Sequence, residues 1–275
     1  MKTVRTAEQL RAELARHSGK KVGFVPTMGS LHEGHLSLIA AATDSCDVVV
    51  ASIFVNPLQF GPHEDFAAYP RDESRDLELV AEAAVDVVFL PSVDEMFPPG
   101  RTTTVSVGPI GDMFEGADRP GHFDGVATVV AKLFNLVRPD VAFFGQKDAQ
   151  QVAVIKQLVR DLSFDIELAI CPTVRDADGL ALSSRNAYLS ADERPRASAL
   201  HRALLVGAGS LHDKDFDATE KKMWELLVAE GLEPSYAAAV DPETFGPPDP
   251  RGPVLLVIAA RLGKTRLIDN LLVQD

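Results

Sequence analysis

The stretch Pro26-Thr27-Met28-Gly29-Ser30-Leu31-His32-Glu33-Gly34-His35 decides the fold of this chain. Apolar runs at 22–25 and 36–42 flank it, and this order predicts a loop that leads from a buried strand into a helix. The two histidines, three positions apart, would share one face of the first helical turn. There the backbone N–H groups have no intrahelical partner and the helix dipole is positive. Such a place suits an anion, and phosphate above all.

A zinc site is one alternative for this histidine pair. A zinc-binding helix of the H-E-x-x-H kind spaces its histidines four apart, whereas His32 and His35 are three apart with Gly34 between them. Two ordinary surface histidines are the other alternative. Because Gly29 and Gly34 allow a ligand to approach the backbone closely, a nucleotide site is the preferred interpretation.

The overall composition is typical of a soluble globular protein. The chain has 275 residues, enough for two domains, with 46% hydrophobic and 24% charged residues. Its formal net charge of −13 argues against a nucleic acid or an anionic membrane as partner. We expect no signal peptide and no membrane span, because no apolar run is long enough. Cys46 and Cys171 lack a C-x-x-C partner and should be reduced thiols, so the sequence predicts a cytoplasmic protein.

Strand and helix patterns alternate up to about residue 170. Strands are expected at 22–25, 48–54, 85–90, 102–107, 141–144 and 166–170, and helices at 6–17, 71–84, 124–137 and 149–162. This alternation predicts an α/β fold, a Rossmann-like doubly wound parallel sheet, which binds ligands at the carboxyl ends of its strands. Beyond residue 173 the expected order changes to helices at 191–209 and 218–229 and strands at 235–240, 254–260 and 267–268. We therefore expect a first domain over 1–173 and a smaller α+β lid domain over 174–275.

The familiar phosphate-binding motifs are missing from the sequence. Gly263-Lys264-Thr265 ends like a P-loop, but Ile258 stands where the first glycine is required. Two other loops carry groups that suit phosphate: Lys147 follows a predicted strand, and Ser183-Ser184-Arg185 offers two hydroxyls and a guanidinium. Each alone would be an ordinary solvated loop. Together with the histidines they could bracket a triphosphate from both domains.

Seven motifs in order resemble one family. They are PTMGSLHEGH (26–35), SIFVNPLQF (52–60), YPR (69–71), RPGHF (119–123), GQKDAQQ (145–151), LSSRN (182–186) and AARLGKTRLIDN (259–270). This set is similar to the pantothenate synthetases, ligases that join pantoate to β-alanine, and covers nearly the whole chain. The resemblance places the fold in the paired-histidine nucleotidyltransferase superfamily.

The resemblance implies a two-step reaction with ATP and Mg²⁺. The carboxylate of pantoate would attack the α-phosphorus to give pantoyl adenylate and pyrophosphate, and the amine of β-alanine would then displace AMP. Fixed donors would stabilise the charge that develops on the phosphates.

The resemblance also implies the site residues. The catalytic residues would be His32, His35, Lys147 and Arg185, with His35 as proton donor. The ATP contacts would be Met28, Gly29, Ser30, Leu31, His32, Glu33, Gly34, His35, Gly145, Gln146, Lys147, Asp148, Val174, Leu182, Ser183, Ser184 and Arg185. Gln59 and Gln151 would bind pantoate, and Asp76 would hold Mg²⁺ directly or through its water. The small-molecule partners would be pantoate, β-alanine and ATP.

The chain departs from the family at three positions. The family commonly has glutamate and an aromatic residue where this chain has Gln146 and Ala149, and often a second acidic residue where Arg75 stands. The family is typically a homodimer, and the predicted strand 102–107 would be a reasonable pairing edge.

Two other functions stay open from the sequence. A nucleotidyltransferase acting on a phosphate ester shares the histidine loop but has no need for Gln59, Gln151 or a full lid domain. A catalytically silent ATP-binding module would be favoured if Lys147 or the histidines were absent, and they are present.

Overall fold

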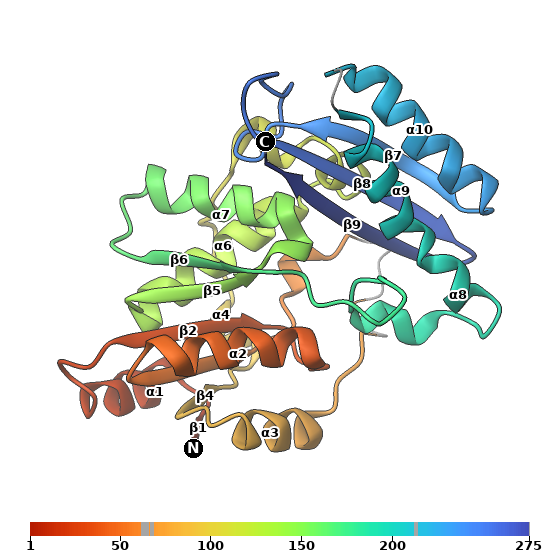
Figure 1. Ribbon diagram of the computed structural model, residues 1–275. Helices are drawn as coiled ribbons and strands as arrows, with labels where there is room; N and C mark the ends of the chain where they lie inside the picture. Colours follow the sequence, from red (N-terminus) through yellow and green to blue (C-terminus); the bar gives the residue numbers. More distant parts are fainter. Residues whose placement is uncertain (62–65, 67–68, 212–213, 275) are drawn as a thin grey trace. The chain divides into compact units, whose positions relative to one another are not determined.

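The structure is a computed structural model, and it describes residues 1–61, 66, 69–211 and 214–274. The chain forms two compact units (Figure 1). Unit 1 consists of Met1–Gly145 and Val154–Cys171, and unit 2 of Gln146–Ala153 and Pro172–Asp275. The grouping of 146–153 with unit 2 was not expected from the sequence.

Within the described residues, unit 1 is built on a six-stranded parallel sheet in the order β1-β4-β3-β2-β5-β6. Its strands are β1 (Lys2–Val4), β2 (Val22–Thr27), β3 (Val48–Ile53), β4 (Val87–Phe89), β5 (Val141–Gly145) and β6 (Glu167–Cys171). The chain leaves β2 toward β3 and later returns to β5 on the other side, so the strand order reverses at β2. The predicted doubly wound fold is confirmed, and the histidine loop follows the strand at its switch point.

Helices connect these strands. The longer ones are α1 (Ala7–Ala15), α2 (Glu33–Ser45), α3 (Glu73–Glu82), α6 (His122–Val137) and α7 (Ala149–Asp161). The shorter turns are η1 (Pro57–Gln59), α4 (Val93–Met96), η2 (Gly108–Gly111), α5 (Glu115–Asp118), η3 (Gln146–Asp148) and, in unit 2, η4 (Ser184–Tyr188). As predicted, Thr6 caps α1, and its hydroxyl accepts a hydrogen bond from the Gln9 backbone.

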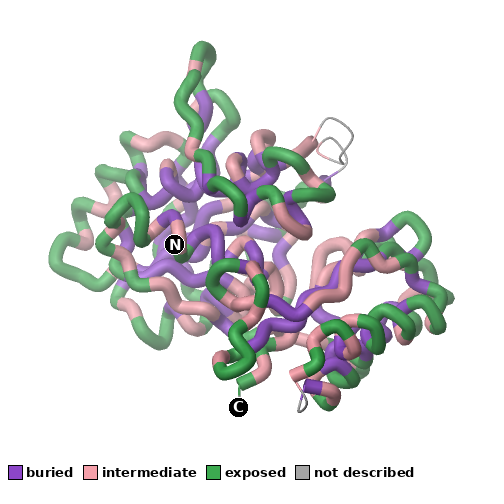
Figure 2. Tube along the Cα trace, turned by 90° about the horizontal axis from the view of Figure 1, so that it is seen from above, coloured by how far each residue is buried: buried purple, intermediate pink, exposed green. Residues whose placement is uncertain are grey.

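The strands of unit 1 are buried on both faces. Phe24 and Val50 are fully buried on one face, while Val25 and Ala51 on the other pack with Ile39 of α2. A strand covered on both faces excludes polar residues, which explains the continuous apolar runs in the sequence. Buried residues are purple in Figure 2.

Unit 2 contains an antiparallel sheet of β7 (Glu233–Val240), β8 (Val254–Leu262) and β9 (Thr265–Val273), with β8 in the middle. The helices are α8 (Glu193–Ala197), α9 (Ala199–Ala208) and α10 (Phe216–Ala229). Figure 1 shows α9 and α10 against this sheet, and Leu204 and Met223 of these helices share a core with Leu256 and Ile258 of β8. The expected helix over 191–209 is thus two helices, and β9 is longer than predicted.

The predicted strand at 102–107 is wrong. Residues 101–107 are all described and have no strand conformation. The N–H of Val105 donates to the hydroxyl of Thr128 (2.9 Å), and the N–H of Val107 donates to Asp124 (3.1 Å), both on α6. β-Branched residues favour extended backbone, but a strand also needs a partner strand, and here a helix takes its place.

Other expectations concern smaller features. The three-residue strand β1 was not predicted from the sequence. Cys46 and Cys171 are free, as expected. Over the described residues, no helix combines the length and the hydropathy that a membrane crossing requires.

Candidate active site

The paired histidines begin α2. His32 is the N-cap residue and His35 lies in the first turn, with the ring centroids 4.1 Å apart. Nδ1 of His32 accepts from the N–H of Gly34 (3.1 Å), and Nδ1 of His35 accepts from the N–H of His32 (3.3 Å). Because Nδ1 accepts in both rings, the proton of each neutral imidazole sits on Nε2. The backbone therefore sets both histidines as Nε2–H donors.

Side chains occupy several backbone amides around this helix start. The N–H groups of Ser30 and Leu31, which precede the helix, donate to Asp76, and those of His32 and Gly34 donate to the imidazoles. These four amides therefore already have hydrogen-bond acceptors within unit 1, and anion binding at the helix start stays a prediction.

Asp76 of α3 fixes the backbone of the histidine loop that precedes α2. Its side chain is buried, with Oδ2 2.8 Å from the Ser30 nitrogen and Oδ1 2.8 Å from the Leu31 nitrogen. Gly29 and Ser30 have left-handed backbone, with φ of 80° and 52°. A Cβ on Gly29 would lie 2.8 Å from Oδ2 of Asp76, so the turn requires glycine there. Two charge-assisted hydrogen bonds thus compensate a strained turn.

This geometry does not fit Asp76 as a direct Mg²⁺ ligand. Both of its oxygens already accept backbone N–H groups, and the residue is 2% exposed. Among the described residues, no group of three or more His, Cys, Asp or Glu side chains could hold a metal ion. The Asp76 carboxylate stabilises the backbone of the histidine loop instead.

Gln59 is positioned by a network of its own in unit 1. Its side-chain oxygen accepts from the Asn56 amide (3.0 Å), and its Nε2 donates to the Met28 sulfur (3.0 Å). Its backbone carbonyl accepts from Arg119 (3.1 Å) and lies 2.8 Å from Nδ1 of His122. Arg119 and His122 of the RPGHF motif therefore hold the backbone of Gln59, the residue proposed to bind pantoate. The sequence alone gave this motif no role.

Gly125 allows this arrangement. A Cβ at this position would lie 2.2 Å from the carbonyl oxygen of Leu58 and 2.8 Å from the nitrogen of Gln59. Asn56 also donates to the Gly125 carbonyl (3.1 Å). Helix α6 and the turn η1 are thus in backbone contact, which only glycine permits.

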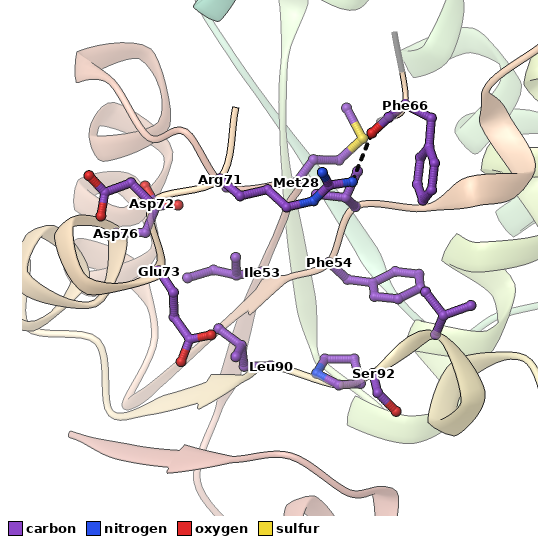
Figure 3. Close-up of a pocket in the computed structure, with 14 residues that line it drawn as sticks. Met28, Ile53, Phe54, Phe66, Arg71, Asp72, Glu73, Asp76, Leu90 and Ser92 are labelled. Carbon is purple, nitrogen blue, oxygen red and sulfur yellow. Dashed lines mark hydrogen bonds between the residues drawn. The ribbon is translucent and has the colours of Figure 1, made fainter. Parts of the chain in front are cut away.

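A cavity of about 250 Å³ lies beside Met28 (Figure 3). Its lining is mainly apolar and consists of Met28, Gly29, Ile53, Phe54, Val55, Phe66, Arg71, Asp72, Glu73, Asp76, Leu90, Pro91, Ser92 and Val93. Arg71 of the YPR motif donates to the carbonyl of Phe66 (2.8 Å) and lies over the Phe66 ring. The side chain of Met28 therefore borders both this cavity and Gln59.

Gly145 ends β5 in unit 1, and the remaining candidate residues lie in unit 2. Lys147 is in η3, its Nζ 3.8 Å from Oδ1 of Asp148, and Gln151 follows in the first turn of α7. The N–H of Leu182 donates to the carbonyl of Val174 (2.9 Å), so the two ends of the second candidate loop pair with each other. This loop leads directly into η4, which holds Ser184 and Arg185.

Ser183 caps this turn, and its hydroxyl accepts from the N–H of Arg185 (3.2 Å). The structure thus places Val174, Leu182, Ser183, Ser184 and Arg185 in one loop, and their contact with ATP stays a prediction. Asn56, Arg119 and His122 were not predicted as supporting residues, although each lies within a motif quoted above.

A doubly wound sheet whose switch-point loop carries paired histidines is typical of α/β proteins that bind a ligand at that edge of the sheet. Residues 2–272 match the family described as Pantoate-beta-alanine ligase, and the chain belongs to this family. The family expected from the motifs is confirmed.

Curated relatives agree with this assignment. The chain is 52% identical over 263 residues to the pantothenate synthetase of Caldicellulosiruptor saccharolyticus, covering 94% of each chain. It is also 52% identical over 277 residues to that of Herpetosiphon aurantiacus, covering 98% of this chain and 99% of the other.

Solved structures give the same result. The pantothenate synthetase of Thermus thermophilus is 50% identical, with a TM-score of 0.93 over 98% of this chain and 99% of the other. The pantoate-β-alanine ligase of Francisella tularensis, described as complexed with β-γ ATP and β-alanine, is 36% identical, with a TM-score of 0.82 over 99% and 97%.

Proposed function

We propose that this chain joins pantoate to β-alanine with ATP, giving pantothenate, AMP and pyrophosphate through a pantoyl adenylate. The observation that carries this proposal is the family match over residues 2–272, which includes all of the loops described above. The solved relative described with β-γ ATP and β-alanine supports the same substrates.

The first step activates a poor electrophile. A carboxylate oxygen of pantoate forms a bond to the α-phosphorus, the bond from that phosphorus to the bridging oxygen breaks, and pyrophosphate leaves with the electron pair. Negative charge develops on the phosphate oxygens during this step. We assign its stabilisation to the Nε2–H groups of His32 and His35, the ammonium of Lys147 and the guanidinium of Arg185. Donors fixed in advance stabilise such charge best, and the capping bonds fix both imidazoles.

The second step forms the amide. The amine of β-alanine attacks the acyl carbon of the adenylate, loses a proton, and AMP departs with the electrons of the acyl–oxygen bond. We assign Gln59 and Gln151 to pantoate, because an amide can both donate to a carboxylate and bond with hydroxyls. The other ATP contacts implied by the motifs, from Met28 to Gly34, at 145–148 and at 174 and 182–184, belong to the same proposal.

Magnesium is proposed as a companion of ATP rather than of the protein. It would enter on the phosphate oxygens and neutralise part of their charge. Asp76 would then affect the position of Mg²⁺ only indirectly, because its carboxylate holds the histidine loop.

We also propose a homodimer and a cytoplasmic location. The homodimer now rests on the family resemblance alone, since the strand that would have paired is absent at 102–107. A sedimentation mass close to one 29.6 kDa chain at micromolar concentration would contradict it. The cytoplasmic location rests on the reduced thiols and the composition.

Product analysis separates the proposed ligase from the rival nucleotidyltransferase. With ATP, pantoate and β-alanine, the ligase releases one AMP and one pyrophosphate for each pantothenate. A nucleotidyltransferase would instead join AMP to the phosphate of a phosphate ester, forming a stable diphosphate and releasing pyrophosphate. Accumulation of such a nucleotidyl product without pantothenate would overturn the proposal.

A further inference from the structure

Asn270 of β9 holds the backbone on both sides of Lys147. Its side-chain amide donates to the carbonyls of Gln146 and Lys147, both at 2.9 Å. In return, Nε2 of Gln146 donates to Oδ1 of Asn270 (3.2 Å). Asn270 is 4% exposed, so water competes little for these bonds. The two peptide groups that flank the Lys147 side chain are therefore fixed to β9.

Asp269, the preceding residue, holds the second candidate loop. It is 3% exposed and accepts two hydrogen bonds from Arg175, at 2.6 and 2.9 Å. Arg175 also donates to the carbonyls of Gly179 (3.0 Å) and Asn270 (3.3 Å). A bidentate arginine and carboxylate fix direction as well as distance. The loop that begins at Val174 is thus tied to the same strand.

The part of β9 that carries both residues is paired with β8. Asp269 pairs with Ile258 and Asn270 with Val257 of the buried strand β8. The N–H of Asn270 also donates to Oδ1 of Asp269 (2.8 Å). Residues 146–153 and β9 both belong to unit 2.

We propose that Asp269 and Asn270 are positioning residues for the ligation reaction, which hold Lys147 and the Ser183–Arg185 loop on one strand. The two sets of phosphate donors then keep a fixed separation within unit 2. This inference rests on the proposed role of Lys147. Asn270 acts through that lysine and touches no substrate.

A double-mutant cycle tests this inference. Asn270→Asp keeps the shape but replaces an amide that donates to two carbonyls with a carboxylate that repels them. The rate of pyrophosphate exchange into ATP, with pantoate present, is measured for Asn270→Asp, Lys147→Ala and the double variant. The matched control is Asn135→Asp on α6, an exposed amide that donates to the Ala131 carbonyl (2.8 Å). Asn270→Ser, which keeps one donor, is the milder variant if Asn270→Asp folds poorly.

We expect Asn270→Asp to slow exchange by about 10²-fold, as a misplaced catalytic group does, and Asn135→Asp to leave it unchanged. The double variant should be no slower than Lys147→Ala, because both changes remove the same contribution. Hydrogen exchange of the amides at 146–149 should rise in Asn270→Asp and stay unchanged in the control.

Two results would overturn the inference without touching the proposed function. One is a slow Lys147→Ala with a normal Asn270→Asp, and the other is a double variant in which the two losses multiply. A normal rate for Lys147→Ala would instead contradict the proposed role of Lys147, and the positioning role would fall with it.

Discussion

The carboxylate of Asp76 lies 2.8 Å from the backbone nitrogen of Ser30, which precedes it by 46 residues. A second bond of 2.8 Å reaches Leu31. Because these bonds hold the left-handed turn at 29–30, the loop that begins α2 depends on a side chain from α3. The position of the paired histidines is thus a tertiary property and not a local one.

Asp76→Asn should therefore lower the activity, because the histidine loop loses part of its support. The amide keeps one acceptor but places an NH₂ group against a backbone donor, and each lost bond to a charged group costs about 1.5–3 kcal/mol of stability. We expect a lower unfolding midpoint and a loss of roughly 10²-fold in kcat, because the imidazoles shift. Steady-state kinetics and thermal unfolding check this, with the exposed Glu78→Gln on the same helix as control. Full recovery of activity at high Mg²⁺ would show that Asp76 is a metal ligand after all.

Gly125→Ala should damage the support of Gln59. The new methyl group would lie 2.2 Å from the Leu58 oxygen, so α6 or η1 must shift. We expect a destabilisation of about 1–3 kcal/mol, as in other overpacked sites, and a raised KM for pantoate with little change for ATP. Gly209→Ala is the control, since its nearest contact would be an ordinary 3.5 Å. Equal KM values for pantoate in both variants would contradict the link between Gly125 and Gln59.

His201 should make the stability of unit 2 depend on pH. Burial chiefly, and then the charge of Arg175, lower the pKa of this imidazole from 6.5. Its buried Nδ1 has no hydrogen-bond partner within the described part of the chain. The folded state then binds fewer protons than the unfolded state, so stability is full above pH 6.5 and is lost as pH falls below it.

Denaturant unfolding of the wild type and of His201→Leu between pH 7.5 and about 5 tests this linkage. The wild type should lose more stability over this range than the variant. Parallel curves for the two proteins would mean that His201 adds nothing to the pH dependence.

Local patterns predicted most of the fold, and long-range contacts account for what they missed. The strand 22–25, the histidine loop and the Thr6 cap follow from neighbouring residues. The sequence at 102–107 has the composition of a strand, but only the fold shows that α6 supplies its hydrogen bonds. Periodicity could not reveal the partner of Asp76, because that partner lies in a different βα unit.

The candidate site was predicted from motifs rather than from spacing. The motifs indicated the residues expected to contact ligand, such as His35, Lys147 and Gln59. They did not indicate how these residues are held, because Arg119 and Asn270 act through backbone carbonyls far away in sequence. The support becomes visible only when the chain is folded.

We propose above all that the histidine loop serves the adenylation step. Labelled pyrophosphate exchange into ATP, with pantoate and Mg²⁺ present and β-alanine absent, measures that step alone. We expect the wild type to exchange and His35→Ala to be slower by about 10²–10³-fold, the usual loss for one missing donor at a developing charge. Exchange that requires β-alanine, or a His35→Ala variant that exchanges at the wild-type rate, would contradict the claim.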